Sequence, residues 1–116
     1  MKKLRRILVA ISDLENAHGS VLRRAAALAR ATDAQVELFH AVTAPFMESW
    51  PVGRQLMPLQ IPLADSLILA QTNLERIARS MLLRGCRVRP GAVADKPAHE
   101  AIVRRVIATR ADLVIT

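Results

Sequence analysis

The chain has 116 residues, of which 52% are hydrophobic and 3% aromatic, with 17 Lys and Arg against 10 Asp and Glu. The hydrophobic content excludes a disordered chain, and the length suits one domain, residues 1–116, with its own core. The scarcity of aromatic side chains excludes a base-stacking surface for single-stranded nucleic acid. The single cysteine, Cys86, excludes an internal disulfide and indicates a reducing compartment, so we expect a cytoplasmic protein.

The net charge of +7 raises the question of an acidic partner. The arginines are scattered as pairs, such as Arg23-Arg24 and Arg104-Arg105, and do not form one tract. A solvated basic surface therefore explains the charge better than nucleic-acid binding does. The apolar run after the basic N-terminus is too short for a signal peptide, and no stretch is long enough to span a membrane.

The first third of the chain predicts a strand, a helix and a second strand. Residues 7–11 are apolar and mostly β-branched, which is typical of a parallel strand buried on both faces. Apolar residues then recur at helical spacing from a candidate N-cap at Ser20 to about residue 31. Residues 35–42 predict the second strand, and the crossover between two such strands is almost always right-handed.

Residues 43–62 are expected to form a long proline-rich loop. This segment holds four of the six prolines, a density that disfavours a regular helix or a central strand. Two alternatives remain open for it, namely a loop packed over the sheet edge and a lid or docking surface beside a ligand crevice. The first is favoured, because scattered apolar side chains are ordinary on protein surfaces.

The second half of the chain predicts a helix, a strand, a helix and a strand. The first helix is expected over residues 63–84, with Gly85 as its C-cap. Residues 87–94 follow as a strand, which Pro90 assigns to an edge of the sheet because proline has no N–H to donate. A further helix begins at Pro97, and residues 112–116 form an apolar fourth strand.

Ser12 and Asp13 are the first candidates for a site, because they follow the carboxyl end of the first strand, where open parallel sheets bind ligands. The three histidines raise the question of metal binding, and Ser12 with a histidine raises that of nucleophilic catalysis. The chain has no His-x-x-x-His spacing and no Gly-x-Ser-x-Gly motif. We therefore expect neither a metal site nor catalytic residues.

Four segments in this order resemble the universal stress protein family: residues 7–11, 38–42, 97–103 and 111–115. The proline-rich loop and residues 95–100 are most similar to the first domain of the tandem, E-type members. The resemblance implies a Rossmann-like, adenine nucleotide alpha hydrolase-like α/β fold, an open parallel sheet with helices on both faces. The implied strand order is 3-2-1-4, with the fifth strand missing and the domain C-terminally incomplete.

The resemblance also implies an ATP or AMP site where the first two strands end. Carried over residue by residue, its positions here are Ala10, Ser12, Asp13, Ala41 and Val42. The family's strand-1 Asp aligns with Ser12, and a shift of one residue turns the side chain of Asp13 to the other side of the strand. The family's glycine-rich phosphate loop would begin after Thr116. We therefore expect no tightly bound cofactor, with ATP or AMP binding left to a full-length parent.

These observations favour a non-enzymatic regulatory or interaction module of the stress response, with nucleotide binding weak or lost. The alternative is an ATP- or AMP-binding regulatory stress protein when full length, and the second alternative is a basic nucleic-acid-associated domain. The open edge of the fourth strand predicts pairing with a second copy, as a homodimer, or with a second universal stress protein domain.

Overall fold

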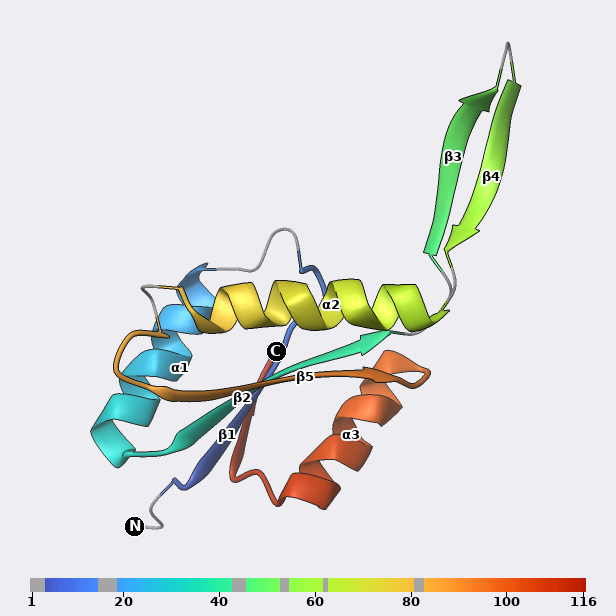
Figure 1. Cartoon of the computed structure of the whole chain (residues 1–116). Helices are drawn as coiled ribbons and strands as arrows, with labels where there is room; N and C mark the ends of the chain where they lie inside the picture. Colours follow the sequence, from blue (N-terminus) through green and yellow to red (C-terminus); the bar gives the residue numbers. More distant parts are fainter. Residues whose placement is uncertain (1–3, 15–18, 43–45, 53–54, 62, 81–82) are drawn as a thin grey trace.

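The computed structural model describes residues 4–14, 19–42, 46–52, 55–61, 63–80 and 83–116. Strands and helices alternate through most of the chain (Figure 1). In chain order the elements are β1 (Arg6–Ala10), α1 (Gly19–Thr32), β2 (Gln35–Val42), β3 (Phe46–Val52), β4 (Gln55–Ile61), α2 (Leu63–Ala78), β5 (Arg87–Ala94), α3 (Ala98–Thr109) and β6 (Leu113–Ile115).

Four parallel strands form the main sheet, in the order β5-β2-β1-β6. This order is the predicted 3-2-1-4 when only these four strands are counted, so the α/β fold class and the topology are confirmed. Pro90 lies in β5, which pairs with β2 alone among the described residues, and such an edge strand accommodates a residue that has no N–H to donate. β1 lies between β2 and β6 and is covered on both faces, which agrees with its apolar composition.

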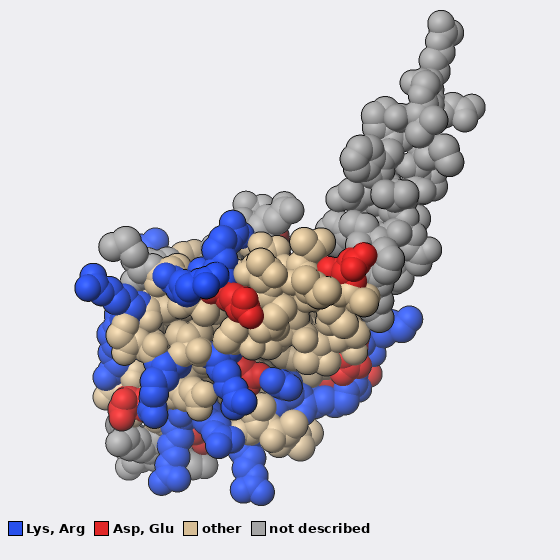
Figure 2. Space-filling model, in the orientation of Figure 1, with Lys and Arg blue, Asp and Glu red and all other residues tan. Residues whose placement is uncertain are grey.

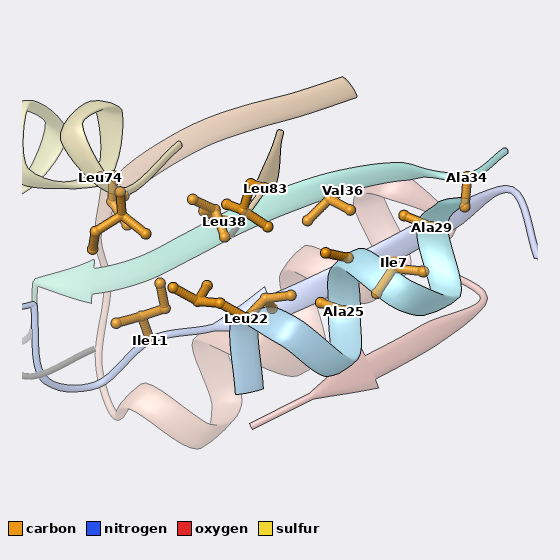
Figure 3. Close-up of a cluster of buried hydrophobic side chains, with 13 residues drawn as sticks. Ile7, Ile11, Leu22, Ala25, Ala29, Ala34, Val36, Leu38, Leu74 and Leu83 are labelled. Atoms are coloured by element: carbon orange, nitrogen blue, oxygen red, sulfur yellow. The ribbon is translucent and has the colours of Figure 1, made fainter. Parts of the chain in front are cut away.

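Each face of the sheet packs against its own helices, because side chains alternate along a strand. The larger cluster joins alternate residues of β1 and β2 to α1 and α2, and Figure 3 shows the side chains of Leu22, Ala25 and Leu74 among them. On the other face, Leu8 and Phe39 pack against Ala101 of α3. The alanines of α1 allow the helix to lie close to the strands, since Ala25 and Ala26 are fully buried.

The structure corrects the loop expected over residues 43–62. β3 and β4 pair antiparallel across most of this segment, with Pro58 opposite Ser49 and Pro51 opposite Leu56. In a two-stranded ribbon each strand has an edge without a partner, so a residue that lacks an N–H can be accommodated there. The two strands form a separate sheet that extends away from the four-stranded sheet (Figure 1).

The helix expected over residues 63–84 is also shorter than predicted. α2 ends at Ala78, and the chain then turns, with hydrogen bonds from the Ser80 N–H to the Ile77 carbonyl and from the Leu83 N–H to the Ser80 carbonyl. Gly85 has a φ of +81°, so it supplies the left-handed turn before β5 but does not cap α2 directly. Within the described ranges, none of the helices has the length and apolar character needed to cross a bilayer.

Candidate functional site

A hollow of about 440 Å³ lies at the carboxyl ends of β1 and β2, beside the start of α3. Its lining side chains are mostly apolar, with two hydroxyl groups and one imidazole among them. The residues are Ala10, Ile11, Ser12, Phe39, His40, Ala41, Val42, Ala98, Ile102 and Thr116. The winding of this sheet reverses between β1 and β6, and Thr116, which follows β6, places the hollow beside that point.

Backbone pairing aligns the strand ends that form this hollow. Ala10 lies opposite Phe39, and the Ile11 N–H then donates to the Phe39 carbonyl at 2.8 Å. On the other side of β2, the Asp95 N–H donates to the Val42 carbonyl at 3.2 Å. These bonds continue the sheet for one residue beyond β1 and β5, so the walls of the hollow are held by rigid backbone.

His40 ties the two strand ends together through its side chain. Its Nδ1 lies 2.7 Å from the Ile11 carbonyl oxygen, and the ring is half-buried. A carbonyl oxygen can only accept, so Nδ1 carries the proton in this hydrogen bond, and Nε2 is left as the second polar atom of the ring. The imidazole can therefore offer an acceptor, or a second donor when it is charged, to a molecule in the hollow.

The loop between β5 and α3, which leads to the lining residue Ala98, carries a charged group that is paired with α3. The Asp95 carboxylate accepts hydrogen bonds from Arg104 Nε at 2.9 Å and from Arg104 Nη2 at 2.7 Å. This pairing with Arg104, helped by the backbone N–H of Lys96, holds the pKa of Asp95 below its ordinary value. The pair fixes the loop that leads to Ala98, the first residue of α3 and part of the lining.

The structure brings four of the five predicted site residues to one hollow. Ala10, Ser12, Ala41 and Val42 line it. Asp13 instead lines a smaller adjoining hollow of about 50 Å³, on the side of α1. The two hollows share Ala10, Ile11, Ser12 and Thr116. Asp13 stands one residue after the position that the family pattern gives to its aspartate. Because side chains alternate along a strand, the side chain of Asp13 is expected on the other side from that position, and the structure places it in the other hollow.

Sequence reasoning did not select the other lining residues. Phe39 and His40 belong to the same strand end as Ala41, and their apolar neighbours gave a signal only for burial. Ala98 and Ile102 come from α3, and only the tertiary structure shows that the start of this helix closes the hollow. In the described part of the chain, no three His, Cys, Asp or Glu side chains are placed to hold a metal ion.

An open four-stranded parallel sheet with helices on both faces and a hollow at its carboxyl edge defines a Rossmann-like α/β domain. A family model described as the universal stress protein family matches residues 3–116, so the chain belongs to that family. No curated protein matches the sequence. The tandem, E-type assignment and the missing fifth strand stay predictions.

Two solved structures have the same fold. One is a universal stress protein from Archaeoglobus fulgidus, with a TM-score of 0.67 and 21% identity, and the match covers 97% of this chain and 73% of that one. The other is a universal stress protein in complex with cAMP, with a TM-score of 0.61 and 16% identity, covering 97% of this chain and 71% of that one. At these identities the likeness concerns the arrangement of the backbone.

Proposed function

We propose that this chain is a non-enzymatic regulatory or interaction module of the stress response, located in the cytoplasm. In this proposal the hollow at the carboxyl edge holds an adenine nucleotide only weakly. The observation that carries the proposal is the chemistry of the lining, where the described residues supply hydroxyls, an imidazole and apolar groups but neither Lys nor Arg. A triphosphate needs cations or converging backbone N–H groups, so this lining favours the base and sugar over the phosphates.

The size and shape of the hollow support a nucleoside-sized ligand. Its volume of about 440 Å³ falls in the range of pockets that hold small molecules, and Ala98 and Ile102 provide apolar surface for a flat ring. Ser12 stands where the family pattern has a carboxylate, and a hydroxyl binds a ribose less strongly than a charged acceptor does. An adenine ring would therefore bury apolar surface in the hollow, while the sugar would gain little binding free energy.

Calorimetry with ATP, AMP and cAMP tests this proposal. We expect none of them to bind with a dissociation constant below about 10 μM, which corresponds to roughly 7 kcal/mol. Tighter binding would instead support the alternative of an ATP- or AMP-binding regulatory protein. The complex of a structural neighbour with cAMP is the reason for including that nucleotide.

A variant locates any weak binding that is measured. Ala98 lines the hollow and is exposed, so Ala98→Phe fills the space without disturbing the core. Ala108→Phe is the matched control, because Ala108 is also exposed on α3 but does not line the hollow. We expect the first variant to abolish weak nucleotide binding and the second to preserve it. Equal binding by both variants would place the nucleotide elsewhere.

A further inference from the structure

A second hollow lies at the opposite edge of the sheet, on the face covered by α3. It has a volume of about 80 Å³, and its polar lining comes from three strands and the end of α3. The lining residues are Arg6, Ile7, Leu8, Gln35, Glu37, Arg89, Thr109 and Ala111. The carboxyl-edge hollow shares none of them, so this is a separate site.

The strand register explains why polar side chains meet here. Arg6 lies beside Gln35, and Glu37 lies beside Arg89, on neighbouring strands. Residues 35, 37 and 39 of β2 point to the same face because side chains alternate, and Phe39 on this face packs with Ala101 of α3. Around Gln35 and Glu37 this face of the sheet therefore presents charged and amide groups, whereas around Phe39 it is apolar.

The only acidic side chain in this lining is already paired. Glu37 Oε1 accepts a hydrogen bond from Arg105 Nε at 2.5 Å, and its side chain is 14% exposed. The guanidinium of Arg105 also lies over the Phe39 ring, 5.7 Å from its centre. Glu37 thus forms its ion pair with Arg105 of α3, and none joins it to Arg6 or Arg89.

Arg6 and Arg89 keep donors available for a ligand. Arg6 donates to the Thr109 carbonyl oxygen at 2.5 Å, which uses one of the five N–H groups of its guanidinium. Among the described residues, no carboxylate pairs with the guanidinium of Arg6 or Arg89. The nearby Asp112 carboxylate accepts the backbone N–H groups of Arg5 and Arg6 instead.

We propose that this amino-edge hollow binds a phosphate-sized oxyanion, held by Arg6 and Arg89 with the amide of Gln35. Two guanidinium groups and an amide are the donors that recognise a tetrahedral oxyanion. The volume of about 80 Å³ suits one phosphoryl group and is too small for a nucleotide. The ligand is free phosphate or the phosphoryl group of a small phosphorylated molecule.

Amide NMR spectra of the full chain, titrated with inorganic phosphate, test the proposal. We expect shifts at Arg6, Arg89 and Thr109, with binding weakened about fivefold by Arg89→Gln. Arg76→Gln is the matched control, because Arg76 is exposed on α2 and its removal changes the net charge equally. Equal weakening in both variants, or shifts confined to the carboxyl-edge residues, would overturn the proposal.

Arg6→Gln is a second variant, expected to weaken phosphate binding to a similar degree. This variant also loses the hydrogen bond from Arg6 to the Thr109 carbonyl oxygen, so its unfolding curve is measured to detect any loss of stability. Arg89 makes no such bond within the described ranges, so Arg89→Gln does not have this effect. Failure of the nucleotide titration would leave this result unaffected, because the two titrations report on opposite edges of the sheet.

Further titrations identify the source of the oxyanion. Glycerol phosphate binding at the same amides as tightly as phosphate would support a phosphorylated small molecule, and binding of phosphate alone would support the free ion. Lys and Arg side chains are also spread over the visible surface in Figure 2. An oligonucleotide that binds more tightly than phosphate and weakens equally in all variants would overturn the proposal, because a diffuse basic surface gives that pattern.

Discussion

At the scale of single residues, hydrogen bonds to charged groups hold the segments around both hollows. Asp95 is held by Arg104 at the carboxyl edge, and Glu37 is held by Arg105 between β2 and α3. The two pairs differ in exposure, since the side chains of Asp95 and Arg104 are 31% and 51% exposed, whereas that of Glu37 is 14% exposed. Solvent therefore screens the first pair more strongly, and the two pairs predict different responses to mutation.

The Asp95–Arg104 pair predicts a pH dependence of stability. The folded state lowers the pKa of Asp95, so the contribution is present above the unfolded pKa of about 3.9 and is lost as pH falls through the folded value. We expect Asp95→Asn to lower the melting temperature at neutral pH, and the difference from the unmodified chain to shrink in acid. Thermal unfolding of both chains, from neutral pH to below the unfolded pKa of Asp95, measures this difference in melting temperature.

Arg104→Gln provides the control for this pH effect. In that background the partner of Asp95 is absent, so Asp95→Asn should change the melting temperature little at any pH. A pH-dependent difference that persists in the Arg104→Gln background would show that Asp95 acts through another group.

At the scale of elements, α3 is joined to the sheet by a polar contact inside an apolar interface. Arg105 reaches Glu37 across the space beside Gly91, where an added Cβ would lie 3.2 Å from Arg105 Nη2. Around this contact, Leu8, Phe39 and Ala101 form the buried apolar cluster of this face. The start of α3 borders the carboxyl-edge hollow, and its end borders the amino-edge hollow. The position of this helix therefore depends on both the polar and the apolar contacts.

Glu37→Gln tests the polar part of the α3 interface. We expect it to lower the free energy of unfolding by about 1–2 kcal/mol, because Arg105 keeps an amide acceptor but loses the compensating charge. Glu100→Gln is the control, since Glu100 lies 3.6 Å from Arg104 with both side chains more than half exposed, and should cost at most about 0.5 kcal/mol. Urea unfolding measures both variants, and equal losses would contradict the assigned role of Glu37.

At the scale of the whole molecule, β6 forms one of the two edges of the main sheet in the part of the chain that the structure describes. β6 pairs with β1, and no further strand pairs with β6 in the described part of the chain. Val114 of β6 is 36% exposed, and Val103 and Ile107 add exposed apolar surface on α3. An uncovered strand edge is a template for pairing with another chain, so we propose that the protein associates through β6 with a second copy or a second universal stress protein domain.

Size-exclusion chromatography with light scattering tests this association. We expect more than the monomer mass at tens of micromolar, approximately the range of ordinary weak interfaces. Val114→Lys should shift the protein toward monomer, because a charge on an edge strand blocks pairing. Val103→Lys is the control for general surface hydrophobicity and should leave the mass unchanged. A monomer in the unmodified chain would contradict the proposal.

The sequence was sufficient for those parts of the fold that depend on local pattern. The apolar run at residues 7–11 predicted a strand buried on both faces, Pro90 predicted the edge position of β5, and the structure confirms both. The same kind of reasoning was wrong for residues 43–62, where prolines indicated a loop and the chain pairs as a hairpin. It was wrong there because the cost of a proline in a strand depends on whether its edge has a partner, which no local pattern contains.

The residues of the candidate sites also divide into those that could be predicted from the sequence and those that only the structure shows. Ser12 was selected because it follows the carboxyl end of the first strand, where open parallel sheets bind ligands. Ala10, Ala41 and Val42 came only from the resemblance to the family, and all four residues line one hollow. The contributions of Ala98 and Ile102, and the meeting of Arg6 with Arg89, depend on the docking of α3 and on the register of three strands. Periodicity and composition determined which residues are buried; only the tertiary structure decided which distant side chains share a hollow, since that depends on contacts between elements far apart in the chain.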